Sequence, residues 1–420
     1  MFYSLTTNLE LIGLTLFLAG FFFLAWQRLD WAAALVIFSS PAYLLKINIF
    51  DLPGTVLELE ILLLIVVWLI KKIIKKEKII QGFNWQGAYL WPVGLIIFGA
   101  TLAAIWSPEP GVSAGILKSW VFEPLLFVWI LSDLIKERRQ ISLFIFAWLA
   151  AGSGVALISL AAGQMTFDGR LVGFYLSPNQ LAMTLAPILV LLPGAWFWWP
   201  RQRARGLIIF VGVITFLALY FTYSSGAWLA VLGAIVFWGL VGWRQRIFSF
   251  KKTVGSLLLV FFLFGSFWLA PKLIGKFNNW FLSDQSSMKS RLIIWQVAGR
   301  LIKENWLVGL GPGVFQKPYL AYQKDYAPYP EWAVPHPHNL WLAWWLQAGL
   351  AGLVGFSWLA IRIFRDGFKN LNQTKQPLIL ALMAVWVCLF LHGLVDTTIW
   401  KNDLALVFVI SIVLSYKAGR

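Results

Sequence analysis

Two of the chain's three histidines, His336 and His338, directly precede an apolar segment rich in tryptophan and glycine. An imidazole can take a proton near neutral pH, so a histidine in this place could act as a general base toward a hydroxyl group. The pair is also spaced so that both rings could face one metal ion, but no carboxylate cluster accompanies it and the third histidine is distant in sequence. The sequence therefore favours proton transfer, and we expect neither a metal nor a cofactor.

The second feature that could take part in chemistry is a guanidinium group. The stretch from Ser286 to Asn305 has helical periodicity, and Arg291 falls in the middle of its apolar face, whereas Arg300 lies on a narrow polar stripe. A cation at the centre of a membrane helix costs an estimated ~2.5–3.5 kcal/mol, and less near an interface. We expect Arg291 to face an anionic ligand, with Arg300 as a further contact; a snorkelling or distantly paired arginine is the alternative.

Two more cations lie next to predicted membrane segments. Arg170 comes shortly before one such segment, and its alternative role is a local pair with Asp168. Lys118 lies within a predicted span, as do Glu58 and Glu123, so internal pairing is the alternative for this lysine. Both cations are candidate contacts for an anionic substrate.

The elements that position these groups must be membrane helices. Of 420 residues, 60% are hydrophobic and 12% are charged, and the mean hydropathy is +0.75. A span needs ~20 mostly apolar residues and must satisfy its backbone polar groups internally. We therefore predict an all-α polytopic transmembrane bundle of about 12–13 spans, forming one integral membrane domain over residues 1–420. The predicted spans are 11–26, 31–50, 55–70, 88–106, 115–132, 141–162, 180–199, 206–222, 226–242, 253–270, 338–361, 378–394 and 402–416.

Basic residues set the predicted orientation. The net charge of +16 arises from lysines and arginines that concentrate in alternate loops. By the positive-inside rule those loops are cytoplasmic, which places the N-terminus outside, the C-terminus inside and the long 271–337 loop on the outer face. The basic excess is a topology signal, and we expect the lipid bilayer, not nucleic acid, as the partner of this surface.

Glycines mark places where the backbone must turn or approach closely. On a helical wheel, Gly349 and Gly352 share a face with His338, so the histidine should point into the bundle and away from lipid. The stretch from Gly309 to Phe315 lacks the third glycine of a dinucleotide fingerprint, and its glycines indicate tight turns.

The arrangement of these motifs resembles the O-antigen ligase superfamily, which holds O-antigen ligases, O-antigen polymerases and bacterial protein O-oligosaccharyltransferases. The resemblance rests on His338-Asn339 followed by Gly349 and Gly352, and it spans most of the chain. Ser224-Ser225-Gly226 stands where the family usually has Ser-Arg-Gly. The remaining matched positions, in chain order, are Arg170, Ser177-Pro178-Asn179, Thr222, Ser224, Arg291, Trp295, Gly309, Gly311, Phe315, His392-Gly393 and Asp396.

The resemblance implies an inverting, metal-independent glycosyltransferase of the cytoplasmic (inner) membrane, with an outward-facing site, acting in lipopolysaccharide or other cell-envelope polysaccharide biosynthesis. The donor would be a glycan on undecaprenyl diphosphate, and the acceptor a glycan, a lipid A core or a protein side chain. His338 would be the catalytic residue. The residues implied to bind substrate are Arg170, Asn179, Arg291, Asn339, His392 and Asp396.

Within this class we expect a ligase first, a polymerase second and a protein oligosaccharyltransferase third. A lipid or polysaccharide transporter is the alternative from another class. A transporter should place its polar residues along a path through the bundle, whereas a transferase should gather Arg170, Arg291 and His338 at one membrane face.

Overall fold

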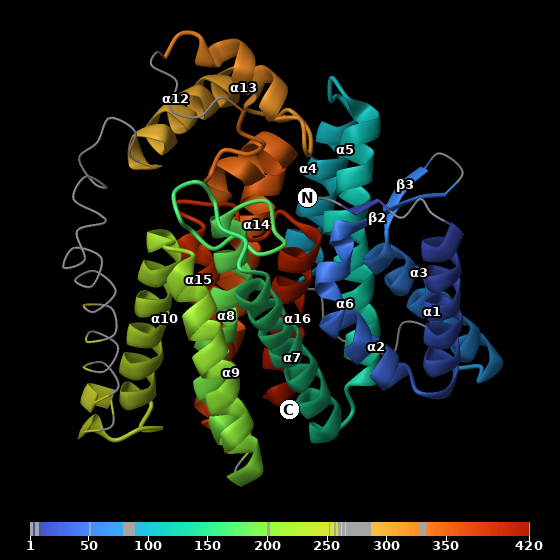
Figure 1. The fold of residues 1–420 in the computed structure, drawn as a ribbon, viewed down its shortest axis with the longest axis vertical. Helices are drawn as coiled ribbons and strands as arrows, with labels where there is room; N and C mark the ends of the chain where they lie inside the picture. Colours follow the sequence, from blue (N-terminus) through green and yellow to red (C-terminus); the bar gives the residue numbers. More distant parts are fainter. Residues whose placement is uncertain are drawn as a thin grey trace.

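The computed structural model describes residues 3–4, 8–49, 52–78, 89–199, 202–251, 253–255, 287–326 and 333–419, with a few single residues between 258 and 265. Within these ranges most of the chain is helical (Figure 1), which confirms the predicted all-α membrane bundle. Seven described helices are long and apolar enough to cross a membrane, and three shorter helices are also apolar. Most of the predicted span 253–270 and the first part of the 271–337 segment lie outside the described residues.

Several helices in the first half of the chain begin at capping residues or prolines. Thr55, for example, accepts a hydrogen bond at its hydroxyl from the backbone N–H of Glu58, 3.2 Å away. The span 110–134 is continuous, but it passes through one π-helical turn at its centre. The helices are α1 (Asn8–Gln27), α2 (Leu29–Phe38), α3 (Val56–Ile74), α4 (Leu90–Ile105), α5 (Pro110–Leu117), the π-helical η3 (Lys118–Phe122), α6 (Glu123–Leu134) and α7 (Arg138–Ala162).

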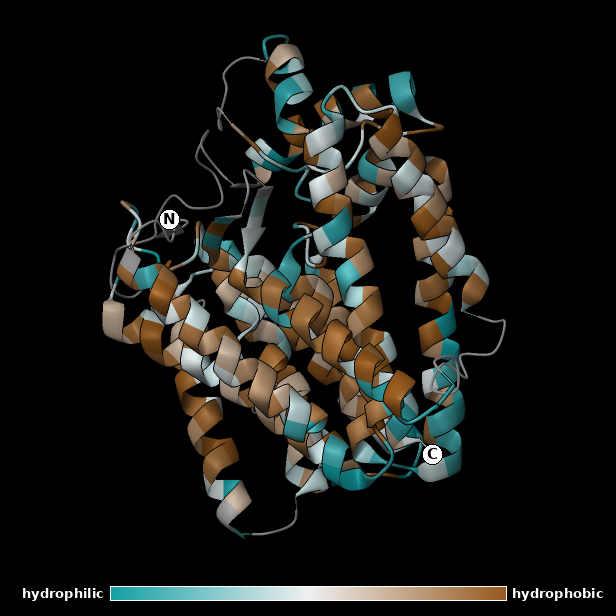
Figure 2. Ribbon diagram, turned by 90° about the vertical axis from the view of Figure 1, so that its right-hand side faces the viewer, coloured by the Kyte–Doolittle hydropathy of each residue, from teal (hydrophilic) through white to brown (hydrophobic). Residues whose placement is uncertain are grey.

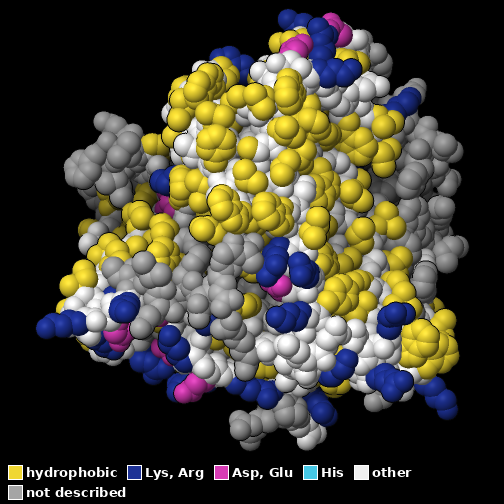
Figure 3. All heavy atoms as spheres, turned by 180° about the vertical axis from the view of Figure 1, so that it is seen from behind, with side chains coloured by type: hydrophobic (Ala, Val, Ile, Leu, Met, Phe, Trp, Pro, Cys, Tyr) yellow, Lys and Arg dark blue, Asp and Glu magenta, His cyan; other side chains and the backbone are white. Residues whose placement is uncertain are grey.

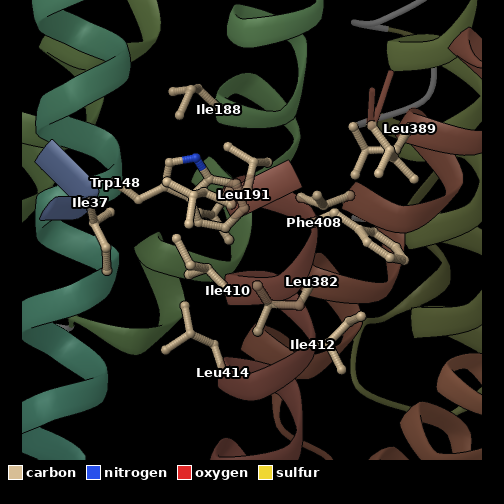
Figure 4. Close-up of a cluster of buried hydrophobic side chains, with 14 of the residues drawn as sticks. Ile37, Trp148, Ile188, Leu191, Leu382, Leu389, Phe408, Ile410, Ile412 and Leu414 are labelled. Carbon is tan, nitrogen blue, oxygen red and sulfur yellow. The ribbon is translucent and has the colours of Figure 1, made fainter. Parts of the chain in front are cut away.

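The second half supplies the centre of the bundle. α14 packs along α4, and α15 packs against both α8 and α10. Trp148, Ile188, Leu382 and Phe408 meet in the core between these helices and α7 and α16 (Figure 4). The helices are α8 (Pro178–Trp198), α9 (Gln202–Phe221), α10 (Ser225–Arg244), α12 (Ser287–Asn305), α13 (Gln316–Gln323), α14 (Leu340–Thr374), α15 (Pro377–His392) and α16 (Asn402–Ala418).

The predicted span 31–50 is wrong as a single helix. α2 ends at Phe38 and is followed by a 3-10 turn, η1 (Ser40–Leu44), because Pro41 cannot continue the backbone hydrogen bonds of α2. The chain then forms β2 (Leu45–Ile49), which pairs antiparallel with β3 (Leu52–Thr55) and parallel with the short β1 (Tyr3–Ser4). β-branched residues in β2 favour a strand over a helix here.

The basic loops gather at one end of the bundle, as their alternation in the sequence predicts. Arg138 donates to the backbone oxygen of Trp198 at 2.8 Å, and Lys417 donates to the backbone oxygen of Ile135 at 3.2 Å. We call this the basic end; α3, α6, α14 and α16 end there, and the C-terminus lies there (Figure 1). The opposite end, where α10, α14 and α16 begin and α12 and α13 lie, we call the site end.

The surface between the two ends suits a bilayer. Brown, hydrophobic residues dominate the middle of the helices, and teal residues collect toward their ends (Figure 2). Seen from behind, a broad area of hydrophobic side chains lies above a band of lysines and arginines (Figure 3). A multi-pass membrane protein accounts for both distributions.

Candidate active site

His338 is fixed at the start of α14 by the residue that follows it. Asn339 caps the helix, and its side-chain oxygen accepts hydrogen bonds from the backbone N–H groups of Trp341 and Leu342, both at 3.0 Å. His338 has a φ of 44°, in the left-handed region that few side chains adopt. Trp295 of α12 donates from its indole nitrogen to the backbone oxygen of His338 at 3.3 Å. A backbone held in this region needs support from its surroundings, and that support here comes from two helices.

The loop between α15 and α16 brings a carboxylate to His338. The Leu340 N–H donates to the Gly393 oxygen at 2.6 Å, and the Asn339 side chain donates to the Leu394 oxygen at 2.9 Å. These bonds tie the loop to the start of α14. As a result, Asp396 Oδ1 lies 3.2 Å from His338 Nδ1, with the Asp396 side chain 1% exposed and the histidine 17% exposed.

Charge in this cluster favours an ionised carboxylate beside the histidine. Burial acts to raise the pKa of Asp396, but the charge and hydrogen bond of His338, together with His336 and His392, outweigh it and hold that pKa well below its usual range. An ionised Asp396 accepts the proton of His338 Nδ1, which leaves Nε2 of the neutral ring as a proton acceptor. A buried carboxylate that orients an imidazole in this way prepares it to act as a base.

The resemblance assigned catalysis to His338 alone, whereas the structure places His336 directly beside it. Its ring packs edge-on against that of His338 with centroids 4.5 Å apart. Burial lowers the pKa of His336 to about 3, and the neighbouring His338 contributes in the same direction, so His336 is neutral at physiological pH. In the sequence, only the His-Pro-His spacing indicated that His336 and His338 could lie together. Their third neighbour, Asp396, comes close only in the folded chain.

The same three side chains offer the only candidate metal ligands in the described part of the chain. One ligand atom from each of His336, His338 and Asp396 lies within 4.8 Å of the other two. His336 Nδ1 and Asp396 Oδ2 make no hydrogen bond to any described residue. A divalent cation could bind here, so the predicted independence of metal needs a direct test by chelation.

α12 places a guanidinium over the same loop. Its apolar face is buried, with Ile294 and Leu301 packed in a cluster that includes Phe315 and Leu346. Arg291 emerges toward α15 and α16, and its Nε donates to the Val395 oxygen at 2.7 Å. Arg291 therefore binds the backbone of the residue that directly precedes Asp396. This geometry agrees with the helix predicted for 286–305 and with an inward position of Arg291. The contact with Val395 was not predicted, because it is made by a backbone carbonyl and does not depend on the type of residue.

Glycines allow α12 and its loop to dock. α14 is interrupted at Gly349 (φ 63°, ψ −168°), where a Cβ would lie 2.3 Å from the Leu307 oxygen. The loop after α12 fills this break: the Leu310 N–H donates to the Leu346 oxygen at 2.6 Å, and Leu350 donates to Leu307 at 3.0 Å. Gly309 has a φ of 80°, as the predicted tight turns require. The loop is thus anchored in the helix that carries His338.

Arg170 belongs to the site end through a different set of contacts. Its guanidinium donates to the Thr222 backbone oxygen at 2.9 Å and to the Asn179 side chain at 2.7 Å. Gly226 follows Thr222 by four residues, in the first turn of α10. A Cβ at Gly226 would lie 2.8 Å from the Val395 side chain and 3.3 Å from the His392 side chain. Arg170 and Asn179 are therefore joined to the Arg291–Asp396 region through the start of α10, which contacts the buried His392.

Two predicted substrate contacts have other partners. Arg300 forms ion pairs with Asp325 at 2.6 Å and Glu304 at 3.5 Å, on the side of α12 that faces α13. Lys118 pairs with Glu58 at 2.9 Å and lies 3.9 Å from Glu123, which is the internal pairing given above as its alternative. The structure does not bring these two cations together with His338.

Comparison with known proteins gives a family match for part of the chain. Residues 210–357 match the family model described as O-antigen ligase. The matched range runs from α9 into α14 and includes Arg291 and His338, whereas Arg170, His392 and Asp396 lie outside it. No curated protein matches the chain.

Proposed function

We propose, on the premise that the chain belongs to the O-antigen ligase superfamily, that it transfers a glycan from undecaprenyl diphosphate to an acceptor hydroxyl at the outer face of the cytoplasmic membrane. The family match supports a membrane glycosyltransferase of the ligase or polymerase type. The observation that carries the finer proposal is the His338–Asp396 pair with Arg291 bound to the same loop. A general base and a cation for the leaving group are then held together at one end of the bundle.

His338 is the proposed base. With Nδ1 donating to Asp396, Nε2 is free to take the proton of the acceptor hydroxyl as its oxygen attacks the anomeric carbon of the donor. The new bond joins that oxygen to the anomeric carbon, and the bond to the diphosphate oxygen breaks with inversion. Asp396 stabilises the imidazolium that forms, so no metal is required for this step.

Arg291 is the proposed ligand of the departing diphosphate. A guanidinium offers donors in a planar fork that suits phosphate oxygens. Arg170, Asn179, Asn339 and His392 complete the proposed donor and acceptor contacts. Arg300 and Lys118 are proposed to act only if substrate displaces their present ion pairs.

The charge distribution supports the orientation. The basic end faces the cytoplasm under the positive-inside rule, and the site end faces outward. The N-terminus is then outside, the C-terminus is cytoplasmic, and the 271–337 segment is external. Gathering of Arg170, Arg291 and His338 at one end is the arrangement expected of a transferase.

Reconstitution tests the proposal. Purified protein in vesicles receives a glycan on undecaprenyl diphosphate, together with a lipid A core, a second donor glycan or an acceptor protein, and the product is identified by mass spectrometry. Transfer to the lipid A core supports the ligase. Elongated donor would identify a polymerase, and glycosylated protein an oligosaccharyltransferase. Turnover should be unchanged after chelation; loss of turnover that Zn²⁺ or Mg²⁺ restores would instead assign His336, His338 and Asp396 to a metal.

The role of Arg291 can be isolated on its own helix. Arg291→Ala should weaken donor binding, and Arg291→Lys should also be impaired, because a point charge does not reproduce the two-pronged contact. Lys303→Ala removes an exposed cation from the same helix and serves as the matched control. Equal donor affinity in Arg291→Ala and the control would remove Arg291 from the donor site.

A further inference from the structure

A hollow of about 240 Å³ opens at the basic end, far from the candidate active site along α3 and α6. It lies between the ends of these two helices and the start of α2. Four lysines and two carboxylates line it, so its wall carries a net positive charge. The lining residues are Leu29, Trp68, Lys71, Lys72, Lys75, Glu77, Asp133, Leu134 and Lys136.

Both carboxylates in the wall are already neutralised. Lys72 is buried and pairs with Asp133 and with Glu77, each at 2.8 Å. Lys136 lies 3.4 Å from Asp133, whose other oxygen also accepts from the Trp68 indole at 2.9 Å. The acidic groups are therefore committed to the floor of the hollow and do not repel an incoming anion.

The remaining positive charge comes from two lysines at the end of one helix. Lys71 lies in the last turn of α3 and Lys75 is its C-cap residue, four positions later, so the two lie on the same side. Among the described residues, neither has a carboxylate at ion-pair distance. Asp30 acts on Lys71, and Lys75 acts on Glu77, only from beyond ion-pair distance. The two neighbouring ammonium groups repel each other, and a bound anion would relieve that repulsion.

Neighbouring side chains place the hollow at the depth of lipid headgroups. Trp26 is 41% exposed, and its ring lies 6.0 Å from the Lys71 ammonium. Tryptophan at the membrane–water boundary is typical of transmembrane proteins. Ile73 and Ile74, on the same helix, are 68% and 64% exposed. A ligand in the hollow therefore meets cations together with the apolar side chains of Leu29 and Leu134, and Trp26 lies next to Lys71.

We propose that this hollow binds the phosphate group of an anionic membrane lipid, with Lys71 and Lys75 on the phosphate oxygens and the acyl chains over the exposed apolar residues of α3. Basic pockets between membrane helices suit such headgroups. A soluble phosphate has the same charge but gains nothing from the apolar side chains of Leu29, Leu134 and Trp26, so the lipid is the better match. This inference is independent of the proposed transferase activity.

The test uses purified, delipidated full-length protein in a neutral detergent. Phosphatidylglycerol should raise the melting temperature and remain bound in native mass spectrometry, whereas phosphatidylcholine with the same acyl chains should do neither. The Lys71→Gln/Lys75→Gln double variant should lose at least half of that shift. Lys76→Gln/Lys78→Gln removes the same charge from neighbouring residues that do not line the hollow, and it should keep the shift.

Three results would overturn the assignment. One is an equal loss of the phosphatidylglycerol shift in both double variants, which would indicate general attraction to a basic surface. Another is an equal shift with inorganic phosphate or glycerol 3-phosphate, which would identify a soluble anion as the ligand. The third is no shift with phosphatidylglycerol in the wild type. Melting temperatures without lipid show whether each variant is folded.

Discussion

At each end of the bundle a buried aspartate lies beside a basic side chain, Asp133 at the basic end and Asp396 at the site end, and the two pairs are built differently. At the basic end, Asp133 uses both oxygens: one accepts from Trp68 and Lys72, and the other faces Lys136. At the site end, Asp396 Oδ1 faces His338 and accepts from the Thr397 N–H, but Oδ2 has no hydrogen-bond partner among the described residues.

The partners differ in chemistry as well. A lysine beside a carboxylate keeps its charge through the physiological pH range, so the Asp133 pair is permanent. A histidine changes charge in that range and can pass its proton on. His338 is moreover held with a positive φ, whereas Lys72 lies within a regular helix. The Asp133–Lys72 pair, in which both carboxylate oxygens have partners and the backbone is a regular helix, is suited to stabilising the fold. The Asp396–His338 pair leaves one carboxylate oxygen without a described partner and contains a titratable side chain on a constrained backbone, which suits catalysis.

The largest expected effect at the site end follows removal of the imidazole. His338→Ala should lower the turnover of glycan transfer by roughly 10²–10⁴-fold, because a positioned proton acceptor contributes about that much. Donor binding should be nearly unchanged. Turnover is measured with the reconstituted enzyme, and the melting temperature serves as the folding control. His338→Gln separates the roles: near-normal turnover in that variant would make His338 a hydrogen-bonding positioner.

At the basic end, the largest effect should be on stability alone. Asp133→Ala leaves Lys72 buried with only the half-exposed Glu77 as partner, and breaking a buried pair from one side costs about 3–5 kcal/mol. The melting temperature should fall clearly, while turnover per folded molecule stays close to that of the wild type. Lost turnover in the folded fraction would mean that the two ends are coupled.

A smaller effect is expected for the carboxylate of the site end. Asp396→Asn keeps the size of the side chain but removes the charge that orients His338, and it should reduce turnover on the order of 10-fold or more, yet less than His338→Ala. The change in melting temperature should be smaller than that of Asp133→Ala. A stability loss as large as in Asp133→Ala, with unchanged turnover, would make the two aspartates equivalent.

The smallest effect concerns His336 and pH. Its pKa is lowered from 6.5 to about 3 in the folded protein, so on acidification the unfolded chain binds a proton before the folded one does. This histidine therefore makes stability fall as the pH drops below 6.5. The lowered pKa of Asp396 keeps that carboxylate ionised until far lower pH, so its contribution persists through this window. Between about pH 7.5 and 5, the melting temperature of His336→Gln should fall less than that of the wild type; an equal fall would contradict a folded state in which His336 stays neutral.

The sequence predicted those parts of the molecule that depend on local periodicity. The helix expected from Ser286 to Asn305 is found from Ser287 to Asn305, since its apolar face is visible residue by residue. The helix break at Gly349 was not predicted, because it depends on a loop some forty residues earlier that inserts its carbonyls there. The strand from Leu45 to Ile49 was mistaken for membrane helix, since a short apolar run fits both.

Single polar residues of the candidate site could be singled out from the sequence, whereas the contacts between them could not. His338 and Arg291 stood out because each is polar in apolar surroundings. The contact between His338 and Asp396 joins residues 58 positions apart, and only the resemblance to a family suggested Asp396. The resemblance assigned no role to His336, whose place beside His338 and Asp396 depends on the fold.

The central claim is that Asp396 acts through His338 as one catalytic unit, and a double-mutant cycle tests it most directly. Transfer is measured under single-turnover conditions for wild type, His338→Ala, Asp396→Asn and the double variant. Residues that act as a unit show losses that do not add. We predict that Asp396→Asn slows the wild type but changes the rate of His338→Ala by less than about twofold. An equal slowing in both backgrounds would contradict the account.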